Sequence, residues 1–227
     1  MSRFSPLVYF DLKEYLHASL FEDVENVWEA LKKIESYLNE QSLGKIEGAV
    51  DKGAILTNPE TISIGKGTIV EAGAYIAGPC IIGEDCEIRH GAYVRGNCII
   101  GNKCIIGHTT EIKNSILLNG SKASHFAYVG DSIIGNNTNL GAGTKLANLR
   151  LDSKTVYVYF EKERINSGLR KFGAIIGDGA ELGCNCVTNP GTLFGKMSKC
   201  YPCVNVSGVI PEMHLVKSEK KNIHVPI

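Results

Sequence analysis

A six-residue repeat through the middle of the chain limits what this sequence can fold into. One large aliphatic residue recurs at every sixth position for nine consecutive repeats: Ile64, Val70, Ile76, Ile82, Ile88, Val94, Ile100, Ile106 and Ile112. Each of the first eight is followed, four positions later, by a small residue: Thr68, Ala74, Cys80, Cys86, Ala92, Cys98, Cys104 and Thr110. Such repeats are typical of a parallel β-helix, in which each hexapeptide forms a short strand and the small side chain fits a tight corner. We therefore expect a mainly β protein.

The repeat continues toward the C-terminus with two changes of period. Steps of five residues lead to Leu117 and from Val129 to Ile134, and six-residue steps resume at Leu140 and Leu146. After a gap the repeat returns at Ile176, Leu182, Thr188, Phe194, Cys200 and Val206. The anchor residues on both sides of the gap therefore belong to one β-helix.

The gap itself predicts an insertion over about residues 155–173. Its sequence, KTVYVYFEKERINSGLRKFG, first alternates apolar and polar residues and then becomes charged, as in a hairpin or loop that leaves the coil. Long insertions in solenoids usually lie on a functional face. We interpret Arg164, Arg170 and Lys171 as solvent-exposed charges, with contact to an anionic cofactor from a neighbouring chain as the alternative.

Residues 1–48 follow a helical period instead. In DVENVWEALKKIESYLNE the apolar residues recur three or four positions apart and form one stripe: Val24, Val27, Trp28, Leu31, Ile34 and Leu38. We expect Asp23 to cap this helix, and Ser5 with Pro6 to open an earlier one in SPLVYFDLKEYLHASLF. The chain then divides into a helical N-terminal appendage for packing or oligomerisation (1–48), a β-helix domain (49–211) and a C-terminal tail (212–227).

Charge and hydropathy argue against two classes of partner. Lys and Arg total 24 and Asp and Glu total 24, so the formal net charge of zero argues against nucleic-acid binding through bulk electrostatics. No apolar run approaches the roughly 20 residues needed to cross a bilayer. The opening MSRFSPLVYFDLKEYL has charges where a signal peptide has an apolar core. We therefore expect a cytoplasmic protein with neither a nucleic-acid nor a membrane partner.

The cysteines do not indicate a zinc site. Four of the eight stand at the small-residue positions of the repeat, where they are explained by corner packing: Cys80, Cys86, Cys98 and Cys104. The CxxC pair Cys200 and Cys203 has no second CxxC or HxH motif near it. We expect no metal to be required.

These hexapeptides resemble those of the left-handed β-helix acyltransferases, in which three hexapeptides make one triangular coil. The stretch IKNSILLNGSKASHFAYVGDSIIGNNTNLGAGTKLANLRLD is similar to the acetyltransferase domain of bifunctional sugar-1-phosphate nucleotidylyltransferases, which make UDP-N-acetylglucosamine. The stretch SGLRKFGAIIGD is similar to the archaeal-type members. The resemblance covers about residues 50–211. It implies a left-handed parallel β-helix that works as a homotrimer, with sites between subunits.

The resemblance also implies the activity. We expect an acetyl-CoA-dependent N-acetyltransferase that acts on an amino-sugar-1-phosphate, with glucosamine-1-phosphate favoured and galactosamine-1-phosphate left open because ring stereochemistry is read by fine contacts. The bifunctional enzymes begin with a nucleotidyltransferase domain that carries a glycine-rich, Arg-containing loop. Nothing in this sequence resembles that loop, and GAGTKL at 141–146 stands in hexapeptide register. We therefore expect no uridyl transfer from this chain.

Stacked coils place residues 18 apart side by side, at the strand spacing of about 4.8 Å. Arg95 and Lys113 are 18 apart and should form a paired cationic site for a sugar phosphate. His90, His108 and His125 form a second column. A histidine column could bind zinc, as in the γ-class carbonic anhydrases, but those have two His five residues apart and no two His here are so spaced. We favour His125 as a general base.

By resemblance, the remaining candidate residues take roles around His125. Tyr128, Asn139 and Lys154 would join Arg95 and Lys113 on the sugar phosphate, and Asn148 would orient the amine. The backbone N–H of Ala142 would face the acetyl oxygen. Cys184 stands where the bacterial enzymes have a Ser that contacts coenzyme A, and Tyr201-Pro202-Cys203 stands in place of Ala-Ala-Gly. The tail offers Lys217, Lys220 and Lys221 but no Arg for the cofactor phosphate.

Two other interpretations of the sequence remain open. The chain could be a non-catalytic β-helix, an assembly or regulatory subunit that keeps the surface without the activity. It could also be a metal-dependent hydratase like the γ-carbonic anhydrases. Binding of coenzyme A separates acetyl transfer from the first, and metal analysis separates it from the second.

Overall fold

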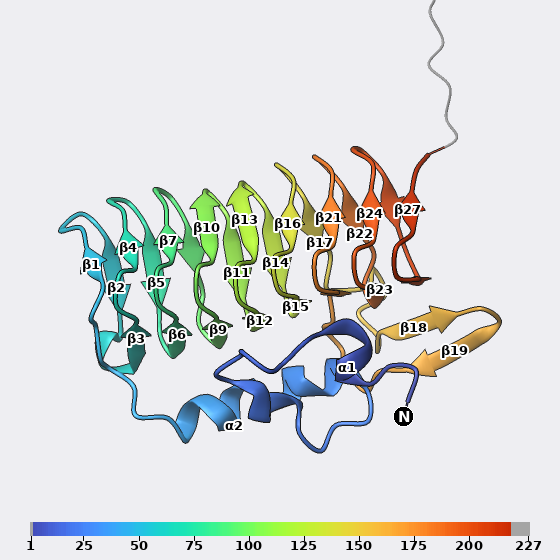
Figure 1. Cartoon of the computed structure of the whole chain (residues 1–227), viewed down its shortest axis with the longest axis horizontal. Coiled ribbons are helices and arrows are strands. Elements are labelled where there is room, and N and C mark those ends of the chain that lie inside the picture. Colours follow the sequence, from blue (N-terminus) through green and yellow to red (C-terminus); the bar gives the residue numbers. More distant parts are fainter. Residues whose placement is uncertain (1, 219–227) are drawn as a thin grey trace, which may run out of the picture.

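The computed structural model describes residues 2–218, and these form a left-handed parallel β-helix with three sheets (Figure 1). Nearly every coil gives one strand to each sheet. Sheet 1 has nine strands: β1 (Ala49–Val50), β4 (Ile69–Val70), β7 (Glu87–Ile88), β10 (Ile105–His108), β13 (Lys122–His125), β16 (Asn139–Leu140), β21 (Glu181–Leu182), β24 (Lys199–Cys200) and β27 (Leu215–Val216). The fold class expected from the repeat is therefore confirmed.

The other two coil sheets have eight strands each. Sheet 2 contains β2 (Ile55–Thr57), β5 (Tyr75–Ala77), β8 (Tyr93–Val94), β11 (Glu111–Lys113), β14 (Tyr128–Gly130), β17 (Lys145–Leu146), β22 (Val187–Thr188) and β25 (Asn205–Val206). Sheet 3 contains β3 (Ile62–Ile64), β6 (Cys80–Ile82), β9 (Cys98–Ile100), β12 (Ser115–Leu117), β15 (Ile133–Ile134), β20 (Ala174–Ile176), β23 (Thr192–Phe194) and β26 (Val209–Ile210). A short 3-10 turn, η3 (Pro59–Thr61), precedes β3.

The aliphatic anchors of the repeat fill the inside of the coil. All nine anchors from Ile64 to Ile112 are at most 1% exposed, and so are the eight small residues that follow them. Within a strand, alternate side chains point to opposite faces, so each anchor points inward while its neighbours point out. The six-residue pattern thus becomes one continuous apolar core.

The five-residue steps in the sequence shorten part of the coil. Tyr93 pairs with Glu111, a difference of 18 in residue number, whereas Glu111 pairs with Tyr128, a difference of 17. The pairs Ile105↔Lys122 and Ile116↔Ile133 also differ by 17. The stack stays in register because the residue is lost at a corner and not within a strand.

A second apolar core covers the outer face of sheet 3. There the residue beside the anchor is also aliphatic, so the strand is buried on both faces. Ile99, Ile116, Ile133, Ile175 and Leu193 are fully buried on this face. They pack in one cluster with side chains of the N-terminal segment. Figure 1 shows this segment running along the coil beside β6, β9, β12 and β15.

The N-terminal segment is less helical than the sequence pattern predicts. It contains α1 (Pro6–Tyr9), the 3-10 helices η1 (Ala18–Phe21) and η2 (Val27–Lys33), and α2 (Ile34–Asn39). The helix opened by Ser5 thus ends at Tyr9, and the prediction of one continuous helix to residue 21 is wrong. The predicted stripe is nevertheless buried from Val27 to Leu38. Contact with sheet 3 decides its path, because a short isolated helix is only marginally stable.

The expected cap of the second helix is also wrong. Asp23 has a left-handed backbone with φ of 53° and precedes the helix by several residues. Instead, Asn26 stands at the N-cap of η2, where its Nδ2 donates to Glu29 Oε1 over 3.0 Å and its backbone N–H donates to Glu29 Oε2 over 3.3 Å. Glu29 therefore closes the first turn from within the helix.

The predicted insertion is an antiparallel hairpin of β18 (Tyr157–Phe160) and β19 (Glu163–Asn166). Val156 and Val158 are fully buried in the same cluster as the N-terminal segment. Phe160 packs edge-on against Phe4 at a centroid distance of 5.8 Å. The hairpin therefore projects from the coil, and the side chains at its base are packed in this buried cluster.

The C-terminal part of the chain continues the coil as far as it is described. β27 adds to sheet 1 within the segment expected as a tail, whereas Lys220 and Lys221 lie outside the described residues. Among the described residues, no helix is both long and apolar enough to span a bilayer.

The packing of the N-terminal segment gives a stability prediction. Trp28 is 1% exposed and lies 5.3 Å from Phe4 and 6.0 Å from Phe172 between ring centroids. Trp28→Ala should lower the free energy of unfolding by about 3–5 kcal/mol, because it leaves a large cavity in a buried core. Urea unfolding followed by circular dichroism measures this. Leu16→Ala, at a side chain that is 82% exposed, should change stability by less than about 0.5 kcal/mol. Equal effects would contradict the packing.

Candidate functional site

The three histidines predicted to stack do form a column, at the corner between sheets 1 and 2. His108 pairs with His125 through β10 and β13. The rings of His90 and His108 lie 5.8 Å apart between centroids and 12° from parallel. His90 Nδ1 donates to Ala72 O over 2.7 Å and His108 Nδ1 donates to His90 O over 3.2 Å. Carbonyl oxygens only accept, so both rings carry their hydrogen on Nδ1.

His125 differs from the other two histidines in the hydrogen bonding of its ring. Its side chain is exposed, and no side chain or carbonyl of the described residues hydrogen bonds to its ring. The adjacent Phe126 is also exposed and lies over Gly143 of the next coil. His125 is thus the histidine of the column with both ring nitrogens unpartnered among the described residues.

The column continues into the residues expected to meet the cofactor. Gly143 N donates to His125 O over 3.0 Å, so Ala142 lies beside His125 in the next coil. Asn185 N donates to Ala142 O over 2.8 Å, which brings exposed Cys184 next. Cys203 N donates to Cys184 O over 2.9 Å, and Tyr201, 53% exposed, stands two residues before Cys203 in that coil. His125, Ala142, Cys184 and Tyr201 therefore follow one ridge, which we call the corner ridge.

The backbone N–H of Ala142 is free on this ridge. The N–H groups of Gly141 and Gly143 donate to Leu182 O and His125 O, over 2.7 Å and 3.0 Å. The N–H of Ala142 has no acceptor among the described residues. It can therefore donate to an oxygen that carries negative charge beside His125.

Tyr128 lies on the outer face of sheet 2, half-buried, one strand away from the ridge. Burial raises its pKa, and the carboxylates of Glu111 and Asp131 raise the pKa further. The absence of a side chain at Gly130 makes room for it, since a Cβ there would lie 2.6 Å from the Tyr128 hydroxyl and 2.8 Å from Asn148 Nδ2. Gly130 thus allows Tyr128 and Asn148 to approach each other.

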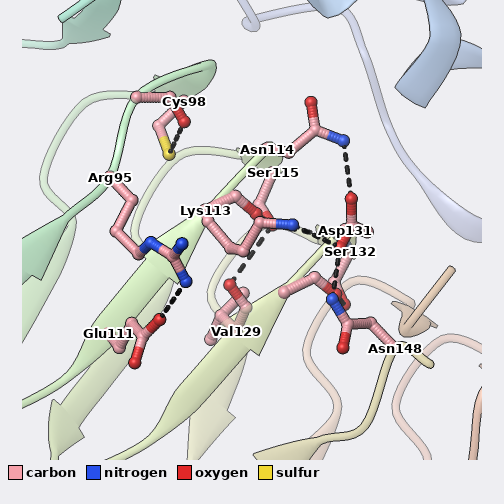
Figure 2. Close-up of polar contacts among 12 residues, drawn as sticks. Arg95, Cys98, Glu111, Lys113, Asn114, Ser115, Val129, Asp131, Ser132 and Asn148 are labelled. Carbon is pink, nitrogen blue, oxygen red and sulfur yellow. Dashed lines mark hydrogen bonds and ion pairs between the residues drawn. The ribbon is translucent and has the colours of Figure 1, made fainter. Parts of the chain in front are cut away.

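Arg95 and Lys113 are adjacent along sheet 2 but do not form a bare cationic pair. Arg95 Nη1 donates to Glu111 Oε1 over 2.8 Å, and Lys113 Nζ donates to Asp131 Oδ2 over 2.9 Å (Figure 2). The Glu111 carboxylate raises the pKa of Arg95. The Arg95 pair is partly exposed, with side chains 42% and 33% accessible, whereas those of Lys113 and Asp131 are 17% and 6% accessible.

Asp131 is the centre of a buried polar network that the sequence patterns did not reveal. Besides Lys113, its carboxylate accepts hydrogen bonds from Asn114 Nδ2 over 2.8 Å and from Asn148 Nδ2 (Figure 2). Asn114, Asp131 and Asn148 are each 17 apart in number and stack at the corner between sheets 2 and 3. The spacing of 17 would have predicted this stack from the sequence, once the shorter coils were recognised. The network holds Asn148 in place, and no group of the described residues donates to its Oδ1.

Two predicted site residues lie apart from this group. Asn139 is exposed on the outer face of sheet 1, between Lys122 and Glu181 of the adjacent strands. Lys154 is exposed in the loop between β17 and β18, where it lines a pocket with other basic residues. The structure therefore brings His125 and Ala142 together on the corner ridge, and Tyr128, Lys113 and Asn148 together across sheet 2.

The described residues of the candidate site do not form a metal site, and they do not line the cavities under the N-terminal segment. Among the described residues, no three His, Cys, Asp or Glu side chains are arranged to hold a metal ion. Two cavities of about 560 Å³ and 650 Å³ lie between the N-terminal segment and the coil, and His125 lines neither. The candidate site is thus an open surface in the single chain.

Comparison with known proteins agrees with the resemblance seen in the sequence. Residues 76–224 match the family described as GMPPB C-terminal domain. The chain is 47% identical over 92 residues to a bifunctional sugar-1-phosphate nucleotidylyltransferase/acetyltransferase of Sulfurisphaera tokodaii, covering 40% of this chain and 23% of that protein. It is 39% identical over 178 residues to the bifunctional protein GlmU of Methanococcus maripaludis, covering 78% of this chain and 42% of that one.

The similarity to solved structures is more distant. An Arabidopsis UDP-N-acetylglucosamine acyltransferase aligns with a TM-score of 0.47 at 14% identity, over 74% of this chain and 69% of that one. The chain spans less than half the length of the two curated relatives named above.

The buried network predicts unequal costs for its two ion pairs. Asp131→Asn should lower the free energy of unfolding by about 3 kcal/mol, because it leaves the mostly buried Lys113 without a counter-charge. Glu111→Gln removes a carboxylate from a partly exposed pair and should cost less than about 1 kcal/mol. Urea titrations of the two variants, each removing one negative charge, provide the comparison. Similar losses in both would show that Asp131 is not the structural centre.

Proposed function

The chain belongs to the GMPPB C-terminal domain family, and from that membership, its acetyltransferase relatives and the corner ridge we propose that it is an amino-sugar-1-phosphate N-acetyltransferase. Acetyl-CoA is the acyl donor and glucosamine-1-phosphate the favoured acceptor. The observation that carries the proposal is that the His125 imidazole and the Ala142 N–H stand in adjacent coils and have no hydrogen-bond partner among the described residues. A base and an oxyanion donor next to each other are what acyl transfer to an amine requires.

The proposed reaction needs no covalent intermediate. The imidazole of His125 accepts a proton from the ammonium group of the sugar and so acts as the general base. The freed amine attacks the thioester carbon, and the negative charge that develops on the carbonyl oxygen is stabilised by Ala142 N–H. The attack forms the C–N bond, and collapse of the tetrahedral intermediate restores the C=O bond and breaks the C–S bond. The nitrogen loses its remaining excess proton, the coenzyme A thiolate takes up one proton to become the free thiol, and His125 returns its proton to solvent.

The other residues would hold the two substrates in position. Asn148, with its Nδ2 fixed by Asp131, presents Oδ1 to the amine. On the sugar phosphate we propose Arg95, Lys113, Tyr128, Asn139 and Lys154. Cys184 and Tyr201, which follow His125 along the ridge, would line the coenzyme A path. Pre-positioned groups of this kind lower the entropy cost of bringing two substrates together.

A homotrimer would complete this open site. Asn139 lies on sheet 1 and Tyr128 on sheet 2, and another copy of the chain that closes over the corner ridge would enclose a sugar between them. Sheet 3 is already covered by the N-terminal segment. Association is therefore expected through sheets 1 and 2.

The direct test is an assay of thiol release with the purified chain. Acetyl-CoA and glucosamine-1-phosphate should release free thiol, and unphosphorylated glucosamine should react at least about tenfold more slowly, since charge-assisted bonds to the phosphate are lost. UTP and N-acetylglucosamine-1-phosphate should give no UDP-sugar. Absence of thiol release with glucosamine- or galactosamine-1-phosphate would favour a non-catalytic subunit.

The role of His125 has its own test, with another histidine of the same column as the control. His125→Ala should lower the turnover number by about 10²- to 10⁴-fold, as expected when a general base is removed. His90→Ala removes an imidazole two coils away, already bonded to Ala72 O, and should stay within about threefold of wild type. Activity of His125→Ala within twofold of wild type would disprove proton transfer by this residue.

A further inference from the structure

A pocket of about 460 Å³ lies between the loop after β17 and the hairpin, outside the corner ridge. We call it the hairpin pocket. Four basic residues line it: Arg150, Lys154, Arg164 and Arg170. Asp152 is the one acidic residue in its lining, so four positive charges and one negative charge give the pocket a net charge of +3. This concentration contrasts with a chain whose formal net charge is zero.

The negative charge in the hairpin pocket is already neutralised. Arg150 binds Asp152 in a fork, Nε to Oδ1 over 2.9 Å and Nη2 to Oδ2 over 2.8 Å. The Arg150 guanidinium lowers the pKa of Asp152, which stays ionised. Lys154, Arg164 and Arg170 have no carboxylate partner among the described residues. Three uncompensated cations thus face one hollow.

One of the basic groups, Arg164, is held in place by the hairpin. The Arg164 guanidinium carbon lies 3.7 Å from the centroid of the Tyr157 ring, which fixes its plane over the aromatic face. Strand pairing sets this contact, since Tyr157 pairs with Asn166 and Tyr159 with Arg164 on the facing strands. The base of the hairpin is buried through Val158. A stacked guanidinium keeps its N–H edge free for an anion.

We propose that the hairpin pocket binds a phosphate monoester or a diphosphate. Phosphate oxygens accept the paired N–H groups of Arg, and a diphosphate offers enough charge to meet the three free cations at once. The pocket adjoins the candidate site. Leu149, which directly follows Asn148, forms an isolated β-bridge with Lys171. This bridge brings the neighbouring residues Arg150 and Arg170 to the same place. The proposal deepens the proposed function and rests on it at Lys154, which is also proposed above for the sugar phosphate. Binding of pyrophosphate is measured without acyl transfer, so the pocket and the activity can fail separately.

Isothermal titration with inorganic pyrophosphate at low salt tests the proposal. Wild type should bind it at one site per chain, with an affinity that falls as salt rises. Arg164→Ala and Arg170→Ala should each weaken binding by about tenfold, the loss expected for one charge-assisted contact. Lys162→Ala removes the same charge from the turn of the same hairpin, outside the pocket lining, and should stay within twofold.

A gain-of-binding variant separates the proposal from simple misfolding. Asp152→Asn removes the negative charge and releases the Arg150 fork, so pyrophosphate should bind about three- to tenfold more tightly. A damaged hairpin could not produce that result. Unchanged or weaker binding by Asp152→Asn, or equal losses in Lys162→Ala and Arg164→Ala, would overturn the proposal. So would the absence of pyrophosphate binding by wild type.

Competition then identifies the source of the phosphate. Displacement of pyrophosphate by glucosamine-1-phosphate would assign the pocket to the phosphate end of a sugar substrate. Displacement by adenosine 3′,5′-bisphosphate would assign it to the nucleotide end of coenzyme A. Failure of both compounds to compete would mean that the pocket takes only the free ion, which would count against the proposal.

Discussion

The stacking of coils in register is the constraint on which the rest of this structure depends. Each anchor side chain is buried against the anchor of the coils above and below, and full burial of one aliphatic side chain is worth about 1.5–3 kcal/mol. A shift of one residue in any strand would turn its anchor outward. The core therefore fixes the register of every strand. The outward-facing residues are aligned from coil to coil by the same register. His90, His108 and His125 align because Ile88, Ile106 and Ala123 do.

The coils in the middle of the chain are one residue shorter than the others, and this changes which side chains meet at the corners. In the shorter coils Asn114, Asp131 and Asn148 come into one stack, and Asp131 can bind Lys113 as well. A carboxylate that is 4% exposed would be costly without such partners. The network in turn holds Asn148 beside Tyr128. The candidate site is thus rigid at the corner of sheets 2 and 3 and open at the corner ridge, where His125 has no partner among the described side chains.

The N-terminal segment and the hairpin share one function in the fold, which is to cover sheet 3. Trp28, Phe4, Phe172 and Val158 belong to the same buried cluster as Ile116 and Ile133. By closing that face they leave sheets 1 and 2 exposed, where the candidate site lies. The hairpin also brings Arg164 to the side of the coil, where Arg164, Lys154 and Arg170 have no carboxylate partner among the described residues.

The sequence by itself determined the β-helix, the insertion and the histidine column, because anchors and corner residues obey a local period that needs no knowledge of distant contacts. In the structure, adjacent aliphatic pairs such as Ile99-Ile100 are buried on both faces of their strand. Only the tertiary structure decided that the N-terminal segment covers the outer face of these strands, and that this contact limits α1 to Pro6–Tyr9. It also decided that Glu111 and Asp131 neutralise Arg95 and Lys113. A period states which backbone positions are neighbours, whereas the partner of a long charged side chain depends on its rotamer and on the nearest opposite charge in space.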